Sequence, residues 1–452
     1  MHPTVYRVTS VLAKLVEPLP LGTNLGLLHL LWMLVSGRLL HSRGAVIPGL
    51  SALGLPAPAV RRAWAALGGG AWSSSQLLAQ WEKLVTEEGQ WQPHRHGGYR
   101  PVAIDVTGFW RPRLAGCPTQ HYDATAGKAL PAIPVGIVAR VGSAGGQRLG
   151  LPVALVRADP QSPGPRDHLR ALVQRAAALA EASDVLVADR EFGVALFQEV
   201  QSPAWVVRLP KNFTARRAAP PAYRGRGRPA QRGALVRPLA RSYRGKVIAA
   251  TPPDREESWE EEGRTLRALV WTGLVLPDAG PDAPTFQVAA VDDPRFPEPL
   301  LLATPLELTP PDLRAVYRDR WPVEQLPLAA KQMLGAVRQY VHEPETSQRL
   351  PELALAAGAA LSYLAATEPA VATGFWDRTP RRTPGRLRRV REYREFPGAA
   401  ALPERVREKA SVTGHLPKGH WGQQHPRQAA AAVPNGSSPA APTPQPSSFS
   451  GN

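Results

Sequence analysis

Four side chains that could bind phosphate or a metal ion recur at helical spacing in the segment YRDRWPVEQLPLAAK. They are Tyr317, Arg320, Glu324 and Lys331, separated by three, four and seven residues. At about 100° per residue, all four fall on one stripe of a helix, roughly 60° wide. Such a stripe is either the solvated face of a charged helix or a site where a carboxylate and two cations act together. The rarity of this spacing favours the site.

Two prolines lie inside this segment. Pro322 suits the first position of a new helix, where its missing N–H has no intrahelical partner. Pro327 would remove a hydrogen bond and kink the helix. A break at Pro327 would move Lys331 off the stripe, so the place of Lys331 depends most on an unbroken helix.

Two aspartates follow apolar strands earlier in the chain. Asp105 ends the apolar part of a strand predicted to begin at Tyr99. Asp189 follows the apolar run at residues 185–188, which is typical of a central strand buried on both faces. With Glu324, these aspartates would supply the oxygen ligands that hard divalent cations require. Two Mg²⁺ ions about 4 Å apart could then support in-line phosphoryl transfer, in which charge stabilisation supplies most of the catalysis.

Other acidic residues compete for these roles, since an isolated aspartate after a strand is more often a turn former or helix cap. Asp123 and Asp159 are alternatives to the first aspartate. Asp184 lies at the other end of the second strand and should be remote from the cleft. Glu191 is close to the second aspartate and stays open as an alternative.

The segment at residues 317–331 resembles the signature of the DDE transposases of bacterial insertion sequences, in the branch marked by Tyr-x2-Arg-x3-Glu-x6-Lys. The block DREF at Asp189 is similar to the second acidic motif of that family, and AIDVTG at Asp105 is similar to the first. The resemblance covers roughly residues 97–340. It implies that Asp105, Asp189 and Glu324 are catalytic and bind two Mg²⁺ ions, with Mn²⁺ as an alternative ion.

The same resemblance implies that the cations of the signature, Arg320 and Lys331, contact DNA phosphates. Tyr317 could donate to a phosphate or stack on a base. Lys211 and Arg190 are further cations near the proposed cleft. The implied activity is cut-and-paste DNA transposition by a homodimer bound to terminal inverted repeats and target DNA. Two alternatives stay open: an RNase H-like nuclease or resolvase without joining activity, and a decayed or domesticated DNA-binding protein.

The elements that must position these residues predict an α/β fold. Three strands, then a helix, strand, helix and strand, is the order of an RNase H-like mixed sheet flanked by helices. We expect a helical DNA-end-binding domain at residues 1–96, the first part of the core at 97–211 and a β-rich insertion at 212–308. The catalytic helix and the rest of the core follow at 309–366. A basic and then disordered tail occupies 367–452.

Composition bounds the partners and the compartment. The chain of 452 residues carries 54 basic and 37 acidic residues, a net charge of +17, which indicates a polyanionic partner such as nucleic acid. Its one cysteine, Cys117, excludes an internal disulfide framework. No signal peptide is apparent, and the apolar stretch at residues 21–37 is too short and too polar for a membrane span. We expect a bacterial cytoplasmic protein on the nucleoid, with a buried helix at that stretch and no membrane contact.

Overall fold

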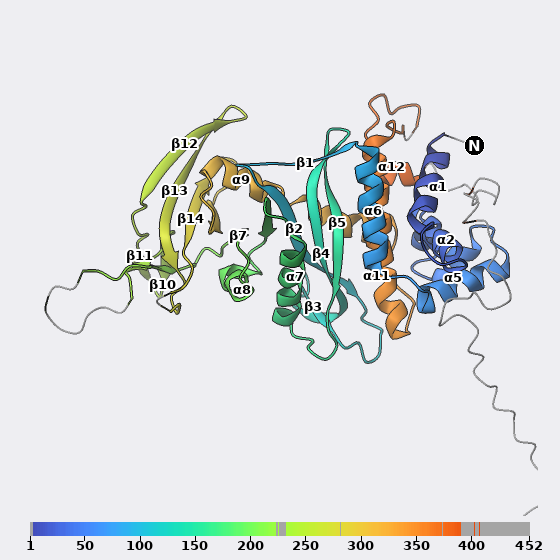
Figure 1. Cartoon of the computed structure of the whole chain (residues 1–452), viewed down its shortest axis with the longest axis horizontal. Coiled ribbons are helices and arrows are strands. Elements are labelled where there is room, and N and C mark those ends of the chain that lie inside the picture. The colour runs from blue at the N-terminus through green and yellow to red at the C-terminus, as the bar shows by residue number, and fades with distance from the viewer. Residues whose placement is uncertain are drawn as a thin grey trace, which may run out of the picture.

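The structure is a computed structural model, and it describes residues 3–222, 225, 232–280, 282–372, 374–389, 402 and 406. It is a mixed α/β protein in which helices flank one large mixed sheet (Figure 1), so the predicted α/β class is confirmed. The tail predicted to be disordered from about residue 422 lies outside the described residues.

The helices fall into an N-terminal group, two beside the central strands, and a C-terminal group. They are α1 (Pro3–Val16), α2 (Thr23–Val35), α3 (Arg38–His41), α4 (Val46–Ser51), α5 (Ala57–Gly69), α6 (Ser74–Glu88), α7 (Pro165–Leu179), α8 (Gly193–Glu199), α9 (Pro310–Arg318), α10 (Pro322–Leu328), the π-helix η1 (Ala329–Met333), α11 (Pro344–Thr367) and α12 (Pro384–Arg389).

Most strands occur in two runs along the chain, with α7, β6 and α8 between them. They are β1 (Trp91–Pro93), β2 (Arg100–Trp110), β3 (Gln120–Asp123), β4 (Lys128–Ala144), β5 (Gln147–Arg157), β6 (Asp184–Ala188), β7 (Trp205–Arg208), β8 (Ala215–Arg217), β9 (Leu235–Val236), β10 (Arg241–Tyr243), β11 (Lys246–Ile248), β12 (Arg255–Glu261), β13 (Arg264–Val275), β14 (Phe286–Asp292) and β15 (Leu300–Thr304).

The sheet has 13 strands and two halves. In one half, β5, β4 and β2 are antiparallel neighbours, and β6 and then β7 continue the sheet parallel to β2. In the other half, β15 pairs antiparallel with β7 and leads to β14, β13 and β12. The strands of residues 212–308 thus extend the same sheet, apart from the separate β10–β11 pair.

Among the described residues, buried side chains of the sheet contribute to three cores. On β2, Ala103 and Phe109 join a core with the N-terminal helices and α11, whereas Val102 and Ile104 join a core with α7 and α8. Every residue of β6 is buried, as its apolar sequence predicts. The central strands are therefore rigid supports, fixed on both faces, for the residues at their carboxyl ends.

Two strongly apolar helices, α2 and α11, are buried inside the protein. Helix α2 falls within the apolar stretch at residues 21–37 and is buried nearly all round, which confirms the predicted buried helix. Helix α11 is long and apolar enough to cross a membrane by length and composition, but 94% of its most apolar window is buried inside the protein. Helices α6 and α11 lie between the sheet and the group of α1, α2 and α5 (Figure 1).

The signature segment does not form the single helix predicted from its spacing. Helix α9, capped as predicted by Thr309, ends at Arg318, and a turn of three residues leads into α10. Pro322 begins α10, as expected. The possible break at Pro327 does not occur, because α10 continues to Leu328 and then widens into η1. A π-helix is rare and often marks a functional site.

Candidate active site

The parallel pairing of β2 with β6 sets the two predicted aspartates side by side. Arg100 is paired with Asp184, and the register runs to Ala103 opposite Val187. Two residues further along the same register, Asp105 stands level with Asp189. Asp105 lies inside β2, which continues to Trp110, rather than at the end of the strand as predicted.

Glu324 reaches this point from α10. Its carboxylate forms an ion pair of 2.6 Å with Arg320, one helical turn earlier. The Arg320 guanidinium lies 5.6 Å from the centre of the Tyr317 ring. The Tyr317 hydroxyl in turn donates a hydrogen bond of 3.3 Å to Asp189. The turn between α9 and α10 therefore keeps these three signature residues in contact without a continuous helix.

Electrostatic coupling shows that the third acid belongs to the same cluster. The pKa of Asp105 is raised to about 7, chiefly by burial and to a smaller extent by the carboxylates of Glu324 and Asp189, against the lowering effects of Arg320 and of a backbone hydrogen bond from Val106. Carboxylates that repel one another in a desolvated place raise their own pKa values. A divalent cation would relieve that repulsion, so the donor set fits a hard ion such as Mg²⁺.

Lys331 also joins the cluster, although Pro327 precedes it. Its ammonium donates a hydrogen bond of 2.7 Å to Thr107 and lies 5.1 Å from the centre of the Phe109 ring. Burial lowers the pKa of Lys331 to about 8, partly offset by the charge of Asp105. The wide turn of η1 thus brings Lys331 onto β2, two residues beyond Asp105.

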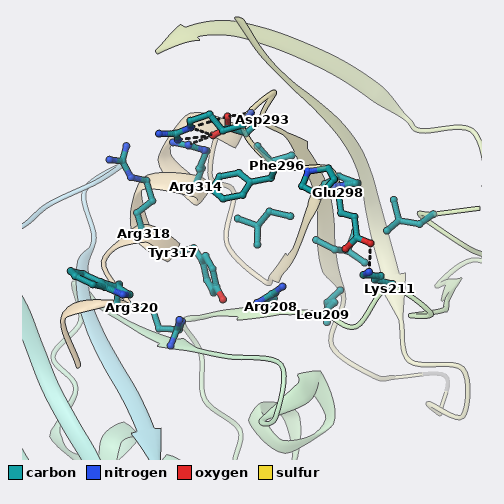
Figure 2. A pocket seen from close by; sticks show the side chains of 18 of the residues that line it. Arg208, Leu209, Lys211, Asp293, Phe296, Glu298, Arg314, Tyr317, Arg318 and Arg320 are labelled. Carbon is teal, nitrogen blue, oxygen red and sulfur yellow. Dashed lines mark hydrogen bonds and ion pairs between the residues drawn. The ribbon is translucent and has the colours of Figure 1, made fainter. Parts of the chain in front are cut away.

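A cavity of about 550 Å³ opens beside this cluster (Figure 2). Tyr317, Arg320 and Trp321 form part of its wall, and Arg208, 3.8 Å from Asp189, forms another part. The charged residues that line the cavity are seven cations and two acids: Arg148, Arg208, Lys211, Arg295, Arg314, Arg318, Arg320, Asp293 and Glu298. Several of these cations form ion pairs, such as Lys211 with Glu298 and both Arg295 and Arg314 with Asp293, but cations still outnumber acids on the wall, which suits a phosphate backbone.

The two other predicted DNA contacts differ in their position. Lys211 forms an ion pair with Glu298 on the side of the cavity away from Arg320 (Figure 2). Arg190 is exposed, and its backbone N–H donates a hydrogen bond of 2.7 Å to the Asp189 side chain. Lys211 thus lies apart from the cluster, whereas Arg190 adjoins it along the chain.

The competing acids are distinguished by their contacts. Asp123 and Asp159 accept backbone hydrogen bonds within tight turns, at 2.8 Å and 2.9 Å. Asp184 is remote from the cluster, as predicted, and pairs with Arg100 and Arg140 at the other end of β6. Glu191 is exposed at the surface, and local desolvation and then the charge of Asp189 raise its pKa. It stays an alternative ligand.

A second cluster was not predicted from the sequence. His94 and His96 both lie against the carboxylate of Asp319, in a group whose ligand atoms could hold a metal ion. The His-x-His spacing was a usable signal, because alternate residues of an extended segment point to the same side. Its partner is more than 220 residues away along the chain, inside the signature turn.

No protein-family model matches this chain, and no curated protein matches it in sequence. Its function is therefore inferred from the residues and the geometry of the site.

Proposed function

We propose that this chain is a DNA transposase of the DDE class, which cleaves DNA strands at the ends of a mobile element and joins them to target DNA. One observation carries the proposal. Three carboxylates from separate parts of the chain, Asp105 within β2, Asp189 just after β6 and Glu324 on α10, lie close enough for the other two to act on the pKa of Asp105. The remaining signature residues, Tyr317, Arg320 and Lys331, lie around them.

The topology supports an RNase H-like core. The strand order β5-β4-β2-β6-β7 has an antiparallel meander followed by two parallel strands. The first acid lies on the central strand of this group, and the second follows the neighbouring parallel strand. The third comes from a helix after the last of these strands, beyond the β-rich residues 212–308. This is the arrangement expected of an RNase H-like enzyme with an insertion.

The carboxylates would hold two Mg²⁺ ions, which supply charge stabilisation for the attacking and leaving oxygens of a phosphoryl transfer. Asp105 must give up its proton to bind a cation, and its raised pKa makes this step sensitive to pH near 7. Arg320 can contact a phosphate with two N–H groups, and Lys331 acts as a single positive charge. The Tyr317 hydroxyl, now on Asp189, is placed to donate to a phosphate oxygen instead.

The partner in this proposal is double-stranded DNA. The cation-rich cavity lies next to the carboxylates and would take the phosphate backbone. The N-terminal helices would bind the terminal inverted repeats, and the protein would act as a homodimer on DNA in the bacterial cytoplasm. The decayed-protein alternative was based on the two prolines, and it loses support because Lys331 still contacts Thr107.

A cleavage assay with Mg²⁺ tests the proposal on DNA that carries the flanking ends of the chain's own element. Wild type is compared with Asp105→Ala, Asp189→Ala and Glu324→Ala. We expect nicking at the element boundary by wild type, and no product from the alanine variants although their DNA binding persists. Asp123→Ala, in a surface turn, is the matched control and should cleave like wild type.

Each other outcome selects an alternative. Wild type that binds DNA and never cuts indicates a DNA-binding protein. Cleavage without joining to a target plasmid indicates a nuclease or resolvase. Cleavage that persists in one alanine variant shows that this acid is not a ligand, and Glu191→Ala is then tested in its place.

A further inference from the structure

The side chains of His94, His96 and Asp319 form a compact group beside the signature turn. Their ligand atoms all lie within 4.8 Å of one another. We propose that these three residues form a binding site for a divalent transition-metal ion of the Zn²⁺ type, separate from the three carboxylates of the proposed active site. Metal binding at this site does not require catalytic activity, so the tests of the site are independent of the tests of the proposed function.

The backbone fixes both imidazoles. His94 directly follows β1, which is held against the edge of β4. His96 is bridged to Tyr99 across a two-residue turn. That turn consists of Gly97 and Gly98, with φ values of 54° and 86°. Two consecutive positive φ values are the mark of the tight hairpin turn that glycine favours. The rings are therefore presented by a rigid turn rather than by a loose loop.

Asp319 provides the third ligand from the turn between α9 and α10. Its side chain is 1% exposed. Its Oδ2 lies 2.8 Å from His94 Nδ1 and 2.7 Å from His96 Nε2. Among the described residues, none donates a hydrogen bond to its Oδ1, and Arg148 lies 3.8 Å away. A buried carboxylate oxygen without a hydrogen-bond partner is costly, and a metal ion beside it would offset that cost.

The donor set selects the class of ion. Two imidazole nitrogens and one carboxylate oxygen suit Zn²⁺ and its neighbours, whereas Mg²⁺ prefers oxygen ligands alone. Ligand atoms in a tetrahedral Zn²⁺ site stand about 3.3 Å apart, so the distances from Asp319 Oδ2 to the two histidine nitrogens must lengthen by about 0.5 Å on binding. A water molecule would complete the tetrahedron. The other nitrogen of His94 lies 2.6 Å from the Ser143 hydroxyl, which orients the ring as outer partners of metal-binding histidines do.

An ion at this site would join two distant segments. It would tie the connection between β1 and β2 to the turn that contains Arg320. Because Arg320 pairs with Glu324 and stacks near Tyr317, the bound ion would hold the geometry of the signature turn. The site is thus a structural clamp for that turn.

Zinc binding by the full-length chain tests this proposal. Equilibrium dialysis with Zn²⁺ and elemental analysis should give one ion per chain for wild type in buffer that contains excess Mg²⁺. His94→Ala and His96→Ala should bind at least about 100-fold more weakly, because loss of a ligand costs no less than loss of an outer partner. Glu324→Gln and the exposed-histidine control His342→Ala should bind like wild type.

A second measurement needs no variant. Diethyl pyrocarbonate modifies accessible imidazoles, and His94 and His96 are 20% and 24% exposed. Zn²⁺ should protect both rings from modification, as mapped by mass spectrometry, and Mg²⁺ should not. The proposal is overturned if wild type binds no Zn²⁺, if neither ring is protected, or if Glu324→Gln loses the ion while His94→Ala retains it.

Discussion

The acids at the two ends of strand β6 have different surroundings. At its start, Asp184 is 1% exposed and lies 2.8 Å from Arg100 and 3.4 Å from Arg140. Just beyond its end, Asp189 is 34% exposed and accepts hydrogen bonds from the Arg190 backbone N–H at 2.7 Å and the Tyr317 hydroxyl at 3.3 Å, and the Arg208 guanidinium lies 3.8 Å away. Asp184 is neutralised by close ion pairs, whereas Asp189 is partly open to solvent and has no close ion pair among the described residues.

The neighbouring strand repeats the contrast. At the start of β2, Arg100 compensates the acids around it, while further along the strand Asp105 is desolvated close to Glu324 and Asp189. A fold has no structural need for a desolvated carboxylate whose pKa is raised further by two neighbouring carboxylates, because replacing Asp105 by an amide would remove that cost. The uncompensated end is therefore where a ligand is expected, and strained electrostatics of this kind are typical of functional sites.

The largest expected effect is that substitution at one end of β6 lowers stability but not cleavage, whereas substitution at the other end lowers cleavage but not stability. Asp184→Asn should lower the free energy of unfolding by about 2–4 kcal/mol, because it leaves Arg100 and Arg140 partly uncompensated. Its cleavage rate below the unfolding transition should stay native. Asp189→Asn should change stability by less than about 1 kcal/mol and lower cleavage at least about 100-fold. Urea denaturation and the cleavage assay measure both, and equal stability losses at the two positions would contradict the comparison.

The second effect is a stabilisation by Asp105→Asn in metal-free buffer. The folded pKa of about 7 exceeds the ordinary value of 3.8, so the folded protein keeps a proton that the unfolded chain loses. Stability from this group is therefore full below about pH 4 and is lost as the pH rises to about 7. At pH 8 the free energy of unfolding of the variant should exceed that of wild type by about 1–3 kcal/mol. At pH 4 the two values should be equal.

Mg²⁺ supplies the control for this prediction. It should raise the stability of wild type at pH 8, because it binds only the folded carboxylate cluster, and should do so much less for Asp105→Asn. Asp159→Asn, in a surface turn, should follow wild type throughout. A difference between wild type and Asp105→Asn that does not change between pH 4 and pH 8 would show that Asp105 is not desolvated.

The sequence predicted the acids and cations that the structure brings together, since strand ends and helical spacing are local properties. The prediction of one helical stripe from Tyr317 to Lys331 was wrong, because it assumed a regular helical period through Asp319 and Pro322. Burial against β2 keeps Lys331 near Asp105 through a π-helix that no spacing rule anticipates. The contact of His94 and His96 with Asp319 depends on the pairing of β1 with β4, which is a long-range property of the fold.

The smallest expected effect concerns Lys331, the buried cation beside Asp105 at the uncompensated end of the strands. Its pKa of about 8 lies below the ordinary 10.5, so it loses its charge as the pH rises from 7 to 9. If it contacts a phosphate, the slope of log affinity for DNA against log salt should fall by about 0.9 over that range. Lys331→Arg stays charged and should keep its slope at pH 9. Lys211→Arg, at the far side of the cavity, should behave like wild type, and an equal fall in slope for wild type and Lys331→Arg would exclude Lys331 as the titrating contact.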